Sequence, residues 1–129
     1  MHKFTSVICL LSVGLFTSMS VAAAATENDS VATQALERGR ALFLDNCAEC
    51  HQSNGRGLKG IYPSLASSEV VRGSGTDVAL QLIIGRGEMP SFAGAMSPQD
   101  MADVVTYVRN AWGNKGDAID AISIERLLD

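Results

Sequence analysis

The sequence predicts a single all-α domain, and three observations support this prediction. Apolar residues recur at helical spacing in two long segments, residues 31–46 and 97–112. Glycine-rich loops at residues 53–62 and 85–97 lie between these segments. No segment shows the sustained alternation of apolar and polar residues that is typical of a half-buried strand. Helices joined by long loops are therefore the expected architecture.

The first 25 residues predict a secretory signal peptide that is removed. Lys3 lies in a short basic start, residues 4–19 are mostly apolar, and a run of alanines precedes a polar segment. We expect cleavage after one of three alanines, Ala23, Ala24 or Ala25. An N-terminal membrane anchor is the alternative, because the apolar run is near the lower length limit for a membrane span. Cleavage implies export to the periplasm and leaves residues 26–129 with no membrane span.

The first long helix is predicted over residues 31–46. One face carries its small and apolar residues, Ala32, Ala35, Leu36, Gly39 and Phe43. Two shorter helical segments follow. Residues 66–72 predict a single turn, and Thr76 is the predicted N-cap of a helix that ends at Gly85.

The last long helix has the clearest start. Ser97 is the predicted N-cap, Pro98 occupies the first helical position and Asp100 the third. The apolar residues Met101, Val104, Val105, Val108 and Trp112 share one face, and Gly113 is the predicted end. Residues 114–129 are polar and then mildly amphipathic, which predicts a terminal helical turn.

The charge of the chain excludes two classes of partner. The formal net charge is −4, and loss of Lys3 with the signal peptide takes it to −5. Such a domain lacks the basic patch of a nucleic-acid-binding protein. It also has little attraction for an anionic membrane surface. A protein partner is expected to meet it through a basic patch or a mainly apolar contact.

The chemistry of the predicted mature chain is concentrated in five residues, Cys47-Ala48-Glu49-Cys50-His51. This is the C-x-x-C-H pattern of covalent haem attachment. Two thiols three positions apart at the end of a helix can reach the two vinyl groups on one edge of a haem. The adjacent imidazole then lies under the iron. The motif predicts one covalently bound haem c, with Cys47 and Cys50 as thioethers and His51 as a metal ligand.

Two other interpretations of the cysteines were compared with haem attachment. A closed zinc site usually takes four cysteine or histidine ligands, and the mature chain has only Cys47, Cys50 and His51. A thiol–disulfide exchange pair usually accompanies a βαβ pattern, which the sequence lacks. Cys9 lies within the predicted signal peptide and is interpreted as one of its small apolar residues.

A sixth iron ligand is sought by elimination. No second histidine remains in the mature chain, so a methionine thioether is the next ligand to consider. Met101 fits the apolar face of the last helix, and Met96 precedes the Ser97 cap as a hydrophobic staple residue. Met89 lies in a loop between glycines and Pro90, where no helical face explains it. Met89 is the favoured ligand, with Met96, a lysine or an open coordination site as alternatives.

Over residues 32–114 the chain resembles a class I c-type cytochrome with one haem. In that family an N-terminal helix that ends in the haem motif crosses a C-terminal helix, with long loops around the cofactor. The residues that carry the resemblance, besides the haem motif, are Gly39, Phe43, Tyr107, Pro63 and the segment Met89-Pro90-Ser91-Phe92. The resemblance implies that the Pro63 carbonyl accepts a hydrogen bond from the axial histidine. It also implies that residues 26–129 form a cytochrome c domain, with a core at 32–114 and a tail at 115–129.

Two segments, residues 61–66 and 103–114, are similar to haem domains in cytochrome c subunits of bacterial periplasmic dehydrogenases. Those subunits often contain three haem domains, and the single motif here corresponds to one. The resemblance implies a non-enzymatic electron carrier between a dehydrogenase as donor and an oxidase or another cytochrome as acceptor. The alternative is a five-coordinate haem protein with peroxidase or gas-sensing activity. The presence of Met89 and the lack of a second histidine argue against that alternative.

Overall fold

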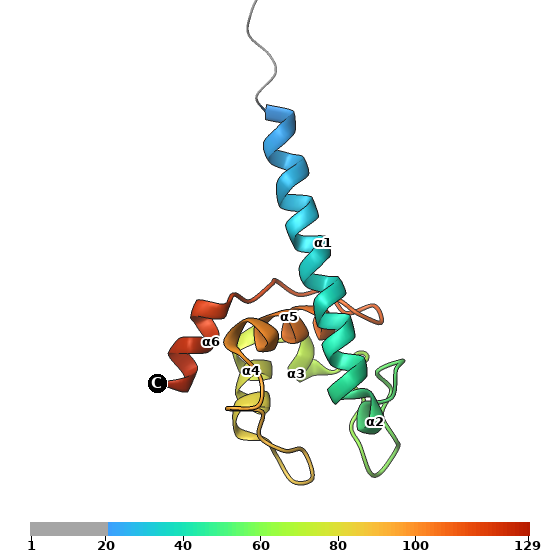
Figure 1. Cartoon of the computed structure of the whole chain (residues 1–129). Coiled ribbons are helices and arrows are strands. Elements are labelled where there is room, and N and C mark those ends of the chain that lie inside the picture. The colour runs from blue at the N-terminus through green and yellow to red at the C-terminus, as the bar shows by residue number, and fades with distance from the viewer. Residues whose placement is uncertain (1–20) are drawn as a thin grey trace, which may run out of the picture.

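The structure, a computed structural model, describes the backbone of residues 21–129 and the side chains of residues 27–129. Its helices, in chain order, are α1 (Val21–Asn46), α2 (Ala48–His51), α3 (Glu69–Arg72), α4 (Gly75–Ile84), α5 (Pro98–Val108) and α6 (Ala121–Leu128) (Figure 1). Isolated β-bridges are the only extended pairings in this part of the chain, and no strand forms there. The prediction of an all-α fold is confirmed.

The crossing of α1 and α5 is the largest helix contact in the fold (Figure 1). Gly39 makes it possible, because a Cβ at that position would lie 2.1 Å from the carbonyl oxygen of Asp103 and 2.7 Å from Cβ of Tyr107. Only a residue without a side chain lets the two backbones approach this closely. Beside the crossing, Nε of Arg38 donates to the buried carboxylate of Asp103 at 2.6 Å. The carboxylate raises the pKa of Arg38, first through this hydrogen bond and then through its charge.

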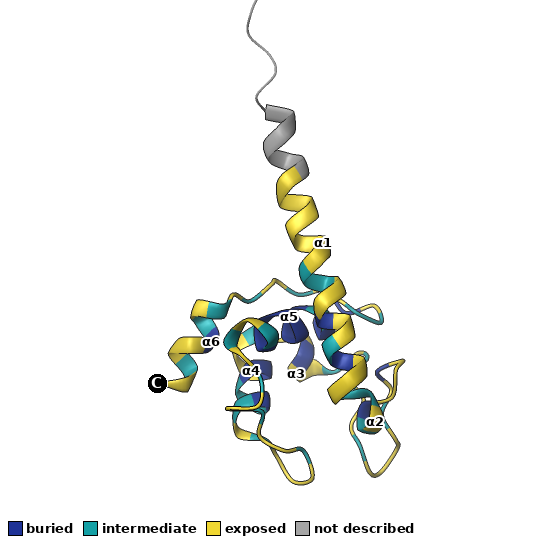
Figure 2. Cartoon of the chain, in the orientation of Figure 1, coloured by how far each residue is buried: buried dark blue, intermediate teal, exposed yellow. Residues whose placement is uncertain are grey.

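The core lies where α1, α4, α5 and α6 meet, as the buried residues in Figure 2 show. Its largest fully buried side chains are Phe43, Met101, Ile124, Val104 and Val105. Ile124 belongs to α6, which is longer than the single turn predicted for the tail. Asp120 caps α6 by accepting a hydrogen bond from the amide of Ser123 at 2.7 Å. The C-terminal helix therefore adds to the core.

Three predicted helix boundaries are wrong. Helix α1 begins at Val21, ten residues before the predicted start at residue 31. Helix α4 begins at Gly75, and its N-cap is Ser74, whose hydroxyl accepts from the amide of Thr76 at 3.1 Å. Thr76 is therefore not the cap but the donor to it.

Helix α5 ends at Val108, not at the predicted Gly113. The amides of Asn110 and Ala111 both donate to the carbonyl of Tyr107, at 2.9 and 2.8 Å, so the helical hydrogen-bond pattern tightens and stops. Trp112 then adopts a left-handed backbone with φ of 52°. It does not continue the apolar face of the helix, although its spacing suggested this.

The predicted signal peptide lies mostly at residues 1–20, outside the described residues. Helix α1 includes the backbone of the predicted cleavage positions, which remain a prediction. Within the described part of the chain, we find no helix that combines the length and the apolar character needed to cross a bilayer.

Candidate haem site

The end of α1 positions the two cysteines. The amide of Cys47 donates to the carbonyl of Phe43 at 2.9 Å, which closes the last turn of α1. The chain then turns into α2, where the amides of Cys50 and His51 donate to the carbonyl of Cys47 at 3.2 and 2.9 Å. Because this one short turn carries Cys47, Cys50 and His51, all three predicted attachment residues are brought together by local structure.

Both cysteines are free and partly buried. Burial raises the pKa of Cys47 to about 11, and the neighbouring charge of Cys50 adds to this shift. A thiol with a raised pKa is a poor thiolate nucleophile near neutral pH. Cys47 therefore lacks the low pKa that is typical of a thiol active in disulfide exchange.

His51 is held in one orientation by a backbone carbonyl. Its ring is buried, and Nδ1 lies 3.0 Å from the carbonyl oxygen of Pro63. Because a carbonyl oxygen can only accept, Nδ1 carries the proton, and the lone pair of a neutral ring is then on Nε2. A carbonyl contact at the ring nitrogen that does not bind the metal fixes the tautomer and raises the basicity of a metal-binding histidine.

Two glycines shape the loop between His51 and Pro63. The amide of Gly57 donates to the carbonyl of His51 at 2.9 Å. A Cβ on Gly57 would lie 2.5 Å from the Pro63 carbonyl oxygen, so a side chain there would displace it. Gly55 has φ of 67°, and its carbonyl accepts from the amide of Leu65 at 2.7 Å. These contacts fold the loop back on itself and place the Pro63 carbonyl against the His51 ring.

Met89 lies in a tight hairpin after α4. The amide and carbonyl of Met89 pair with those of Arg86, both at 3.0 Å. Gly85 precedes the hairpin with φ of 74°, and a Cβ there would lie 2.6 Å from the Met89 carbonyl oxygen. The Met89 side chain is partly buried and packs against the core. We call residues 85–96 the methionine strap.

The methionine strap and the attachment motif lie on the same side of the molecule. In Figure 1 the strap and the loop after α2 both lie below the crossing of α1 and α5. Beside the motif, the pKa of Tyr62 is raised, first by the interaction of its hydroxyl with Cys50 and then by the charge of Cys50. Burial and the charges of Glu88 and Glu49 add smaller contributions in the same direction.

The other two methionines have structural explanations. Met101 is fully buried in α5, which confirms its prediction as a core residue. Met96 is partly buried and packs against the core next to the Ser97 cap, whose hydroxyl accepts from the amide of Asp100 at 3.1 Å. Met89 is also partly buried against the core, but it lies in the hairpin rather than beside a helix cap.

These residues fit a covalent haem. Two free thiols, an imidazole with its Nε2 lone pair available, and a thioether on a separate loop are the donors used by histidine–methionine haem proteins. The observation that carries this fit is the pairing of His51 with Pro63. It leaves only Nε2 to act as a ligand.

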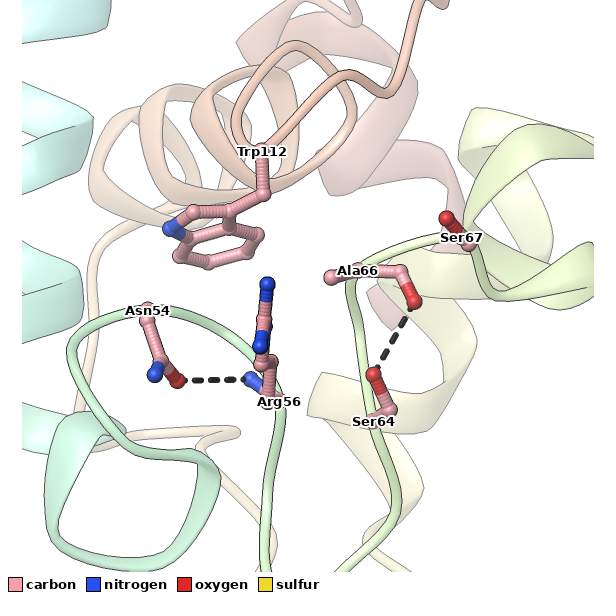
Figure 3. Close-up of a pocket in the computed structure, with 6 residues that line it drawn as sticks. All are labelled: Asn54, Arg56, Ser64, Ala66, Ser67 and Trp112. Carbon is pink, nitrogen blue, oxygen red and sulfur yellow. Dashed lines mark hydrogen bonds between the residues drawn. The ribbon is translucent and has the colours of Figure 1, made fainter.

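The sequence analysis missed the site role of three residues, Trp112, Asn114 and Gly55. Trp112 and Asn114 contact the loop that follows His51. Trp112 also lines a surface groove of about 720 Å³ (Figure 3). None of the predicted ligand residues lines this groove, so it is distinct from the haem site. The signal that could have found the two side chains is their place directly after the last long helix, in a segment already identified by its resemblance.

Comparison with known proteins identifies the family. Residues 34–108 match the family model of cytochrome c oxidase, cbb3-type, subunit III. Cytochrome c6 of Synechocystis sp. is 37% identical over 105 residues, which cover 78% of each chain. The cytochrome c subunit of a quinone-dependent alcohol dehydrogenase from Gluconobacter oxydans is 32% identical over 103 residues. The CcoP subunit of a cbb3-type oxidase from Rubrivivax gelatinosus is 37% identical over 83 residues.

The matched lengths differ among these relatives. The alignment covers 69% of this chain but only 21% of the Gluconobacter oxydans subunit, and 62% of this chain but 27% of the CcoP subunit. The chain thus spans about a fifth to a quarter of these longer relatives. The matches nevertheless confirm the resemblance to monohaem class I cytochromes and the corresponding all-α fold. The chain belongs to the cytochrome c family, whose domain carries covalently bound haem c and transfers electrons.

Proposed function

We propose that the chain is a periplasmic carrier of single electrons, with its haem c attached through Cys47 and Cys50 and ligated by His51 and Met89. The contact that best supports this assignment is the 3.0 Å approach of His51 Nδ1 to the Pro63 carbonyl. It directs the basic nitrogen Nε2 away from Pro63 and makes it the ligand atom. The attachment cysteines precede this histidine within the same turn.

Each residue has a distinct task in this proposal. Cys47 and Cys50 form thioethers, so the short chain retains its cofactor without relying on affinity. Pro63 orients the His51 ring and increases its basicity. Met89 supplies a soft thioether ligand from the opposite loop, which favours the ferrous state and raises the reduction potential.

Haem c, once attached, supplies a one-electron iron couple. The protein contributes ligands, burial and a docking surface. With both axial positions filled by its own residues, the protein requires no coordination of a substrate. Electron transfer then proceeds across a contact with another redox protein. Such contacts are small and short-lived.

The proposed donor is a periplasmic dehydrogenase, and the proposed acceptor is an oxidase or another cytochrome. Relatives that are cytochrome subunits of an alcohol dehydrogenase and of a cbb3-type oxidase support redox partners of these classes. The match to a cytochrome c6 over 78% of each chain supports a carrier built from one haem domain. The periplasmic location depends on the predicted signal peptide, and the negative charge favours a basic or apolar contact on the partner.

The test uses the protein matured in a host that attaches haem c. We expect haem staining after denaturing electrophoresis, a long-wavelength sulfur–iron band in the ferric form, and no rapid binding of carbon monoxide by the ferrous form. An unmodified polypeptide mass would refute haem attachment. A stained protein that lacks the band and binds carbon monoxide freely would instead support the five-coordinate peroxidase or gas sensor.

A further inference from the structure

Helix α5 is followed by a turn, residues 109–114, that forms hydrogen bonds with the loop after His51. We call this the α5 turn, and we call residues 52–67 the proximal loop. Trp112 is the first point of contact. Its Nε1 donates to the carbonyl of Ser53 at 3.2 Å, and its ring covers Gly55 so closely that a Cβ there would lie 2.4 Å from the indole. Figure 3 shows the indole ring above the loop that carries Asn54 and Arg56.

Asn114 is the second point of contact. It is buried, with 3% of its surface exposed. Its Nδ2 donates to the carbonyls of Leu65 and Val108 at 3.0 and 3.1 Å, and its Oδ1 accepts from the amide of Ser67 at 3.1 Å. One side chain thus ties the end of α5 to both sides of Ala66.

The two contacts lie on either side of Pro63 along the chain. Trp112 holds Ser53 and Gly55 before it, and Asn114 holds Leu65 and Ser67 after it. The two ends of this segment are also joined directly, because the Gly55 carbonyl accepts from the amides of Leu65 and Ala66 at 2.7 and 2.9 Å. These contacts fix both ends of the segment that carries Pro63.

We propose that Trp112 and Asn114 are positioning residues that hold the Pro63 carbonyl against the His51 ring and thereby tune the reduction potential of the iron. The inference rests on the proposed function, because it takes His51 as the axial ligand. A histidine that donates from Nδ1 to a carbonyl is a more basic ligand. A more basic ligand favours the ferric iron, so loosening this hydrogen bond raises the potential.

A purely structural role for Trp112 is the competing explanation. Its ring also packs against Phe43 and Tyr107, with ring centroids 5.0 and 5.6 Å apart. Loss of these contacts lowers stability wherever they lie in the fold. A useful test must therefore measure the His51–Pro63 contact separately from the free energy of unfolding.

The test compares two uncharged variants of the haem-loaded protein, Trp112→Phe and Asn114→Ala. The first keeps an aromatic ring but removes the donor to Ser53, and the second removes both amide donors and the acceptor for Ser67. Ile124→Ala is the matched control, because Ile124 is fully buried in α6 and belongs to neither the α5 turn nor the proximal loop. The measurements are the exchange rate of the His51 Nδ1 proton by NMR, the midpoint potential, and denaturant unfolding.

We expect each variant to accelerate exchange of the His51 ring proton by about tenfold, equivalent to about 1.4 kcal/mol of local opening free energy, and to raise the midpoint potential. Ile124→Ala is expected to lower the stability while leaving the ring-proton rate and the potential unchanged. Variants that lose stability but keep both values would overturn the positioning role. Failure of the wild type to attach haem, or histidine ligation absent from its spectrum, would instead refute the proposed function on which the inference depends.

Discussion

The two segments proposed to supply the axial ligands are anchored in different ways. His51 is followed by a loop whose contacts reach across the sequence, to Trp112 and Asn114 beyond α5. The methionine strap is anchored mainly to its own flanks: the amide of Phe92 donates to the carbonyl of Leu82 at 2.8 Å, and the hydroxyl of Ser91 donates to that of Ile83 at 2.5 Å. The strap also packs against the core through Met89, Phe92 and Met96. Because these hydrogen bonds reach only to α4, we expect the strap to open more readily than the loop after His51.

The largest effect is expected at the cysteines, on which both ligand segments depend for a cofactor. The double variant Cys47→Ser, Cys50→Ser should contain no covalent haem, and each single variant should retain at most one thioether. Mass spectrometry of purified protein measures this directly, because the described residues contain only these two cysteines. A double variant that still carries the mass of haem would contradict the assignment of the thioethers.

Met89→Ala should remove the methionine ligand without affecting haem attachment. The thioethers do not involve Met89, so the haem should remain attached. The sulfur–iron band should disappear, the reduction potential should fall, and the ferrous iron should bind carbon monoxide. Spectroscopy and redox titration of the purified variant measure all three.

Two further methionines serve as controls for that variant. Met96→Ala and Met101→Ala should both keep the band. Met101→Ala should nevertheless cost about 2–5 kcal/mol in free energy of unfolding, because the side chain is fully buried. If Met96→Ala loses the band and Met89→Ala keeps it, the ligand assignment is wrong.

Two glycines of the strap test whether it can open without removal of its ligand. In Gly85→Ala the new Cβ meets the backbone of Met89 and Pro90 at 2.6 and 2.8 Å, so the hairpin must shift. The sulfur–iron band should weaken, and carbon monoxide binding should become faster. Gly87→Ala also places an alanine at positive φ, 59°, but its Cβ meets no atom within 4 Å.

Gly87→Ala should therefore keep the band at full intensity, although both variants are destabilised. Absorbance titration with carbon monoxide provides the comparison. Equal loss of the band in the two variants would show that backbone strain, rather than displacement of Met89, controls ligation.

The smallest effect is expected in α6, outside both ligand segments. The hydrogen bonds of Asp120 with Ser123, first to its amide, lower the pKa of Asp120 below the ordinary value of 3.8. A lowered pKa means that the cap stabilises the helix above about pH 4 and loses this effect as the pH falls through the folded-state pKa. Asparagine is a good N-cap at every pH. In Asp120→Asn, the exchange rate of the α6 amides should therefore no longer depend on titration of the residue 120 carboxyl.

Hydrogen exchange of the Ser123 amide between about pH 2 and 5, corrected for the intrinsic pH dependence of exchange, measures this difference. The haem spectrum should not change in Asp120→Asn. A change in the sulfur–iron band would show that α6 is coupled to the strap.

The parts of the site that follow from local spacing could be predicted from the sequence. Cys47, Cys50 and His51 need only one turn of chain to converge, and the structure forms that turn at the end of α1. The helix crossing was implied by the family resemblance, to which Gly39 contributed, and the structure confirms it. Met101 was assigned to the core, and not as the iron ligand, because its spacing matched a buried helical face. The role of Pro63 came from resemblance, since a carbonyl acceptor leaves no mark in side-chain identity.

The tertiary structure decided what the periodicity could not. Trp112 fits the apolar spacing of the last helix, yet the chain leaves the helix after Val108 and places the indole over Gly55. The polar sequence around Asn114 predicts an exposed tail residue, yet Asn114 is buried between the α5 turn and the proximal loop. A residue's spacing reports only the neighbours within a few turns of its own helix. Contacts between backbone carbonyls and side chains about 50 residues apart form only when the whole chain has folded. The position of the proximal loop beside His51 is therefore a property of the tertiary structure.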